Sequence, residues 1–140
     1  METDSLSPAL NTFMFLSIAE TRISRAFDSR LNGLGFTEFI ILFHLVQAEG
    51  EKLRRSDLSE RTGLTPSGIT RLLLPMEKIG LVGRGEDERD ARVRFVTLTS
   101  AGKTKFMEEL PYANALAETK FPANGKEKTA DILQFLKDIR

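Results

Sequence analysis

The chain has 140 residues, 41% of them apolar and 29% charged, and its formal net charge is zero. This is an ordinary composition for a single globular domain with a core of its own. The absence of cysteine excludes disulfides, thiolate metal sites and cysteine nucleophiles, and a single histidine, His44, excludes a multi-histidine metal site within one chain. With one tyrosine and no phosphate-cradling glycine loop, few side chains remain for an active site, so we do not expect an enzyme.

The sequence contains no segment typical of membrane insertion or export. The longest unbroken apolar run, residues 39–43, is far too short to span a bilayer. The opening METDSLSP is acidic and lacks the basic-then-apolar order of a signal peptide. We therefore expect a cytoplasmic protein that has no membrane partner.

The N-terminal segment, residues 6–31, has helical periodicity, and the sequence Asn32-Gly33 with Gly35 should end the helix. Its apolar residues fall on more than one face; they include Leu10, Phe13, Met14, Leu16, Ile18, Ile23 and Phe27. A helix that is apolar on several sides must be covered from several sides. In a small domain this pattern indicates contact with a second subunit.

A second helix is expected after Thr37, which can cap its first turn, with the body EFIILFHLVQ. A short apolar run could equally be a buried strand, but the capping threonine, the length and the polar exit favour a helix. Because the segment is apolar nearly all round, we expect it at the centre of the subunit. A very short strand is expected at Leu53.

The sequence SDLSERTGLTPSGITRLL has the spacing of a helix-turn-helix. Ser59 is a small residue where the two helices would cross, Gly63 suits a turn that needs positive φ, and Ile69 would point back into the angle. Three further apolar residues complete this small core: Leu58, Leu64 and Leu72.

The second of these helices has a capping residue, Thr65, followed by Pro66 in its first turn, where a missing N–H costs nothing. The residues expected to face outward near its N-terminus are Thr65, Ser67, Gly68, Thr70 and Arg71. Hydroxyls and helix N-termini suit phosphates, and arginine suits guanine edges. An ordinary solvated helix end would show the same residues. Pro75 should bend the helix, since it leaves the carbonyl of Arg71 without its usual donor.

Two strands, residues 81–84 and 93–98, are expected to form a hairpin. Alternation places Val96 and Leu98 opposite Val93 and Phe95, so the pattern does not decide which face meets the core. A loop of this kind, GEDERDAR, is usually a solvated charged turn. Its carboxylates are also spaced to pair with arginine side chains and stiffen the tip; the residues concerned are Asp87, Arg89, Asp90 and Arg92.

A stiffened tip would leave Arg89 free to project. A narrow DNA minor groove has a strongly negative potential that attracts such an arginine. A divalent-ion site built from Glu86, Asp87, Glu88 and Asp90 is the alternative, which the interleaved arginines oppose.

After the hairpin, Thr99 should cap a long helix with Phe106, Leu110 and Ala113 on one face. Pro111 lies inside this helix and should kink it. A last helix is expected after Asn124, which forms a capping-box pattern with Glu127. Alone it is too short to be stable and must dock, on its own subunit or on a twin.

The order helix-turn-helix, GLV, a charged loop with Asp87, Arg89 and Arg92, then Val96-x-Leu98-Thr99-x-x-Gly102 resembles the MarR family of winged-helix transcription regulators. The resemblance covers nearly the whole chain. It implies a mainly α, α+β fold in a single domain of residues 1–140. The winged helix-turn-helix would span about residues 37–98, and dimerisation helices would span about residues 6–31 and 99–140.

The resemblance further implies a homodimer that binds a pseudo-palindromic operator in double-stranded DNA, commonly a repressor released by a small aromatic or lipophilic effector. On that basis Arg89 would enter the minor groove, Asp87 and Arg92 would support the wing, and Arg84 would also contact DNA. No cofactor or metal is implied.

His44 lies in the apolar central helix, and two interpretations remain open. It is either a neutral, hydrogen-bonded core histidine or the polar group of a ligand pocket. The residues that would line that pocket are Phe13, Phe39, Phe43, His44 and Met107. A different alternative concerns the whole chain: zero net charge would suit a winged helix that contacts protein instead of DNA.

Overall fold

The computed structural model describes residues 5–140. It contains six α-helices, two short 3₁₀ segments and three strands within that range. In chain order these are α1 (Pro8–Asp28), α2 (Phe36–Gln47), η2 (Glu49–Glu51), β1 (Lys52–Leu53), α3 (Arg55–Thr62), α4 (Pro66–Lys78), β2 (Val82–Glu86), β3 (Arg94–Leu98), α5 (Ser100–Lys120), η3 (Ala123–Lys128) and α6 (Thr129–Asp138). The mainly helical architecture with a small sheet is the winged helix-turn-helix expected from the sequence.

The centre of the molecule is α2, as its apolar composition predicted. Ile41, Leu42 and Leu45 are fully buried, and the helix contacts α1, α3, α5 and β3. Its start differs from the prediction, because Thr37 is not the cap. The helix begins at Phe36, whose N–H donates to Asp28 Oδ1 at 2.8 Å, and the Glu38 carboxylate accepts from the Gly35 N–H. A carboxylate from the end of α1 therefore does the capping.

Three antiparallel strands lie in the order β1-β3-β2. Val82 pairs with Leu98 and Arg84 pairs with Val96, and the side chains of Val82 and Val96 are buried. This register settles the question that alternation left open, since the Val96 face is the one that meets the core. The short strand predicted at Leu53 is β1, which pairs with β3.

The junction between the sheet and α5 is tightly fixed. The Thr99 hydroxyl accepts from the Gly102 N–H at 3.0 Å and lies 2.6 Å from the Gly80 carbonyl oxygen, to which it donates. A Cβ on Gly102 would lie 2.1 Å from the Leu81 carbonyl oxygen, so only glycine lets α5 approach the sheet this closely. The predicted Thr99 cap is confirmed.

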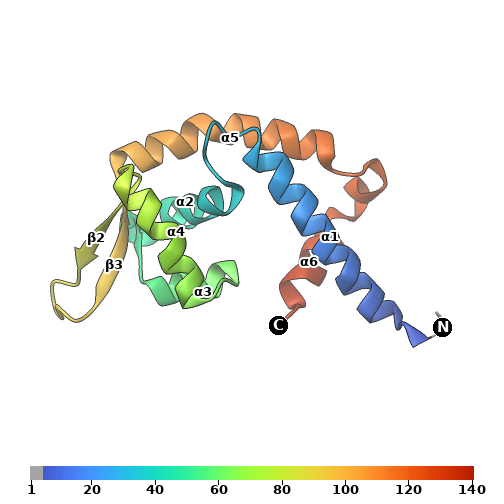
Figure 1. The fold of residues 1–140 in the computed structure, drawn as a ribbon, viewed down its shortest axis with the longest axis horizontal. Helices are drawn as coiled ribbons and strands as arrows, with labels where there is room; N and C mark the ends of the chain where they lie inside the picture. Colours follow the sequence, from blue (N-terminus) through green and yellow to red (C-terminus); the bar gives the residue numbers. More distant parts are fainter. Residues whose placement is uncertain (1–4) are drawn as a thin grey trace.

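The long helix α5 runs across the top of Figure 1, from the sheet to the end of the molecule where α1 and α6 lie. Its first half is attached to the turn after α1, since the buried Glu109 carboxylate accepts from Asn32 Nδ2 at 3.1 Å and Lys105 Nζ at 3.2 Å. The helix continues through Pro111 to Lys120. No helix among residues 5–140 has the length and apolar character needed to cross a membrane.

The predicted start of the last helix is wrong. Residues 123–128 form the 3₁₀ segment η3, and α6 begins only at Thr129, without a side-chain cap. Asn124 and Glu127 therefore lie within η3, before the helix. Because Phe121 ends α5 in an extended conformation and Pro122 follows it, the chain turns sharply before α6 starts.

Candidate nucleic-acid interface

The turn between α3 and α4 is held by its own hydrogen bonds. Gly63 adopts φ 73°, and the Ser59 hydroxyl donates to the Leu64 carbonyl across the turn. The Ile69 side chain is fully buried in the angle between α3 and α4. Leu64 is partly buried and packs against the same core. These are the positions that the sequence assigned to a helix-turn-helix. Two core residues of α4 that the sequence missed are Leu73 and Met76, which are fully buried, whereas Leu72 is only partly buried.

The N-terminus of α4 presents small polar groups. Thr65 caps the helix by accepting from the Gly68 N–H at 3.1 Å, with Pro66 in the first turn. Thr65, Ser67 and Arg71 are exposed, so their side chains can meet a ligand. Thr70 is half-buried; its hydroxyl donates to the Pro66 carbonyl and accepts from Arg55 at 3.4 Å. Of the five predicted residues, Thr65, Ser67 and Arg71 thus present polar side chains at this helix end, and Gly68 has no side chain to block a ligand.

Pro75 is exposed, and α4 continues past it to Lys78. The Ile79 N–H still donates to the Pro75 carbonyl at 3.1 Å. The proline therefore does not end the helix, and it lies in the last turn, away from the polar N-terminus.

The tip of the β2–β3 hairpin, the wing, is stiffened by its carboxylates. Asp87 Oδ1 accepts from the Arg89 N–H at 2.8 Å, and Asp90 accepts from both the backbone and the guanidinium of Arg92 at 3.0–3.2 Å. The hydrogen bonds from Arg92 lower the pKa of Asp90, so this carboxylate stays ionised. The Arg89 side chain is exposed, and among residues 5–140 it has no ion-pair partner.

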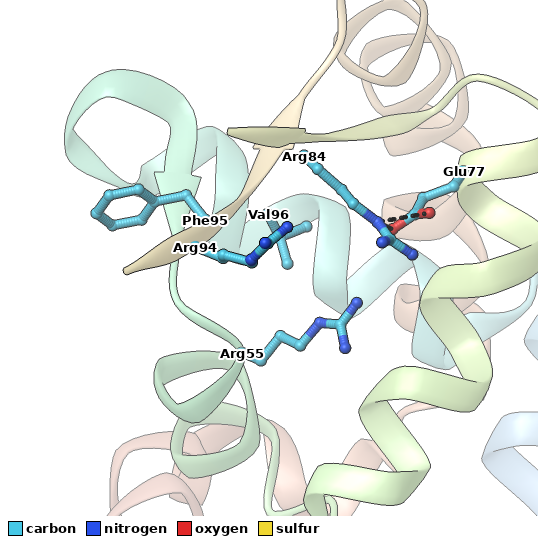
Figure 2. Close-up of a pocket in the computed structure, with 6 residues that line it drawn as sticks. All are labelled: Arg55, Glu77, Arg84, Arg94, Phe95 and Val96. Carbon is cyan, nitrogen blue, oxygen red and sulfur yellow. Dashed lines mark hydrogen bonds and ion pairs between the residues drawn. The ribbon is translucent and has the colours of Figure 1, made fainter. Parts of the chain in front are cut away.

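Arg84 is differently placed from the other predicted contacts. Its Nε donates to both carboxylate oxygens of Glu77 at 3.1 Å, which attaches β2 to α4 and raises the pKa of Arg84. The ion pair lies at a hollow of about 300 Å³ (Figure 2). Six residues line it: Arg55, Glu77, Arg84, Arg94, Phe95 and Val96. Sequence reasoning missed Arg55 and Arg94, because the pairing of β3 with β2 and the packing of β3 against α3 bring them beside Arg84.

The predicted ligand pocket around His44 is not enclosed within one subunit. Phe39 is buried and stacks on Phe106, with 4.9 Å between the ring centroids. Phe13 and Met107, in contrast, are about half exposed, at 50% and 54%. The Phe43 and His44 rings meet edge-on, with 5.2 Å between the ring centroids. The five residues therefore divide between the core and the surface. Burial, and secondarily the charge of Arg61, lowers the pKa of His44, which favours its neutral form.

The alternative of a metal site in the wing receives no support. Within residues 5–140, no group of three or more histidine or acidic side chains is arranged to hold a metal ion.

The sequence model of the MarR family matches residues 32–93, from the turn after α1 to the wing. The fold agrees over the rest of the chain. AbsC, a MarR-family transcriptional regulator from Streptomyces coelicolor, is 26% identical and superposes with a TM-score of 0.79 over 96% of this chain and 93% of its own. Over residues 32–93 the chain is similar in sequence to the MarR family, and its fold is that of a MarR-family regulator.

Two further similarities concern other transcriptional regulators. The HTH-type transcriptional regulator PrsX of Escherichia coli is 31% identical over 84 residues, which are 60% of this chain and 50% of PrsX. The matched chain thus spans about half the length of that relative. Sco3205, a MarR-family regulator from Streptomyces coelicolor solved in complex with DNA, is 19% identical, with a TM-score of 0.78 over 94% of this chain and 88% of its own.

Proposed function

We propose that this chain is a MarR-family, sequence-specific DNA-binding transcriptional regulator of the cytoplasm. The observation that carries the proposal is that two exposed features belong to one folded unit, in which the Arg84–Glu77 ion pair attaches β2 to α4. These are the polar N-terminus of α4 and the stiffened wing tip with Arg89, which is exposed and forms no ion pair within residues 5–140. The description of PrsX as a transcriptional regulator and the DNA complex of Sco3205 support it.

The two features suit different grooves. A helix whose N-terminus offers hydroxyls and one arginine matches the major groove, where Thr65, Ser67 and Gly68 allow close approach and Arg71 can reach a guanine edge. Arg89 at the tip of a narrow hairpin matches the adjacent minor groove. Asp87 and Asp90 support the tip by accepting hydrogen bonds from its backbone.

The proposed form is a homodimer, and the support is the surface of α1 and α6. Only Phe27 of the 21 residues in α1 is buried, and α6 has no buried residue. The exposed large apolar side chains on these two helices are Leu10, Phe13, Met14, Phe15, Ile18, Ile23, Leu133, Phe135 and Leu136. Apolar faces of this extent mark interaction sites. A second copy would cover them and place two α4 helices on half-sites about one helical turn apart.

Repression, relieved by a small aromatic or lipophilic effector, belongs to the same proposal. One subunit does not enclose a pocket around His44 (Phe13 and Met107 are half exposed), so the partner subunit would have to complete it.

The experiment selects bound duplexes from a random-sequence pool with the full chain and then measures affinity for the enriched sequence by mobility shift. We expect a pseudo-palindromic sequence, with an affinity that falls as salt is raised. Recovery of no enriched sequence, or equal affinity for scrambled duplexes, would contradict the proposal.

A further inference from the structure

The inner face of the wing changes character along its length. Near the core this face consists of the buried Val82 and Val96. Since successive side chains alternate between the faces of a strand, Arg84 and Arg94 continue the same face towards the tip. Two arginines thus face the helix-turn-helix at the point where the apolar contact ends.

The opposite wall is formed by Arg55, the first residue of α3, and Glu77 of α4. Figure 2 shows Arg55, Arg84 and Arg94 directed towards one space from three elements, while the Phe95 ring points to the other side of β3. We call this space, lined by the six residues given above, the arginine hollow. It is about 300 Å³ in volume.

Of the three cations of the arginine hollow, only Arg84 is neutralised by an ion pair within residues 5–140. Glu77, the one acidic side chain among the six lining residues, engages Arg84 through both carboxylate oxygens. Within residues 5–140 neither Arg55 nor Arg94 forms an ion pair, and the one side-chain hydrogen bond of Arg55 is the long contact with Thr70. Glu86 is opposite Arg94 in the register but does not form an ion pair with it. Exposed guanidinium groups gathered in this way favour an anion between them.

The position of the hollow identifies the anion. Arg55 contacts Thr70 near the N-terminus of α4, and Arg94 opens the strand β3 directly after the wing tip. The hollow therefore lies between the element proposed for the major groove and the element proposed for the minor groove. The sugar-phosphate backbone that separates two adjacent grooves has to pass between these elements.

We propose that the arginine hollow binds one phosphate of the DNA backbone in each half-site, with Arg55 and Arg94 as its two donors. Arg84, held by Glu77, forms the wall and keeps the wing at a fixed distance from α4. Planar guanidinium forks match phosphate oxygens in pairs, and the hollow has room for the phosphate and its bridging waters. This inference rests on the proposed function, because it assigns a phosphate of the same DNA.

The test uses the duplex enriched by the wild-type chain and compares Arg55→Ala, Arg94→Ala and the double variant. Arg61→Ala is the matched control, since Arg61 is an exposed arginine at the other end of α3, on the side of His44. Each single variant should weaken binding about tenfold, as expected for a charge-assisted hydrogen bond, and the control should change it less than about twofold. All three arginines are exposed, so equal melting temperatures will confirm that the variants fold.

The double variant shows whether one phosphate is shared. Two donors on the same phosphate are coupled, so the double variant should lose clearly less than the product of the two single losses. Losses that simply multiply would mean two separate phosphates and would overturn the shared site.

A second arm identifies the source of the phosphate. Replacing single backbone phosphates by neutral methylphosphonates should reveal one position per half-site that weakens the wild type about tenfold and leaves the double variant unaffected. If instead the variants lose binding of inorganic phosphate in solution and keep full DNA affinity, the hollow takes a free anion and the proposal is wrong. Unchanged DNA affinity in all variants overturns this site alone, whereas failure of the wild type to select any duplex overturns the proposed function.

Discussion

At the scale of single residues, the wing tip separates the proposed DNA contact from the groups that support it. Arg89 is exposed and unpaired in the described chain, while Asp87 holds only its backbone N–H. Arg89→Ala should therefore weaken operator binding by about 1–3 kcal/mol and flatten its salt dependence, with no change in melting temperature. Titration by fluorescence anisotropy at several salt concentrations measures both effects. Tight binding by the variant at matched salt would refute the minor-groove role.

His44 gives a second prediction at this scale, for stability as a function of pH. Burial lowers its pKa in the folded chain, so below a pH of about 6.5 the unfolded chain binds more protons than the folded one. The free energy of unfolding should then decrease as the pH falls from about 7.5 to about 5.5, and His44→Gln should reduce this decrease. Urea unfolding at the two pH values provides the measurement. An identical pH dependence in the variant would show that His44 does not cause it.

At the scale of elements, two glycines are required for different physical reasons. Gly63 needs its positive φ but has open space around it, whereas a Cβ on Gly102 would collide with the backbone of Leu81. Gly63→Ala should cost about 1–2 kcal/mol of stability through backbone strain alone. Gly102→Ala should cost more, because α5 must move away from the sheet. Chemical denaturation of both variants tests the order, and a smaller loss for Gly102→Ala would contradict the tight junction.

The elements also show which features a sequence can predict. Thr65 and Thr99 cap their own helices and Gly63 makes its own turn, so local spacing was sufficient to find them. Thr37 failed as a cap because the donor at Phe36 is satisfied by Asp28, a residue from another helix. The arginine hollow depends on the pairing of β3 with β2 and their approach to α3, which no local pattern encodes.

At the scale of the whole molecule, the apolar surfaces of α1 and α6 determine the expected assembly. Phe15 on α1 is 62% exposed, and a charge placed there should disrupt a dimer interface. Phe15→Glu should shift the chain from dimer to monomer in sedimentation experiments. It should also reduce operator affinity at least tenfold, since two linked subunits no longer bind both half-sites together. Ile79→Glu is the control, because Ile79 is equally exposed, at 66%, but follows α4. A Phe15→Glu chain that remains a dimer would exclude α1 from the interface.

The whole molecule also explains why the pocket predicted around His44 could not be confirmed from one chain. The sequence placed Phe13, Phe43 and Met107 together as apolar residues on three helices. In the structure Phe13 and Met107 are half exposed, so the described part of the subunit does not cover them. Periodicity identifies an apolar face, but it does not say whether the same chain or a second copy covers it.

In the proposed complex, α4 and the wing read one DNA sequence together. The most direct measurement is the affinity of the full chain for its selected duplex and for a scrambled duplex, determined over a range of salt concentrations. We expect one dimer per selected duplex, an affinity at least about a thousandfold higher than for the scrambled duplex, and an affinity that falls steeply with salt. Equal affinity for both duplexes, or no binding to either, would contradict it.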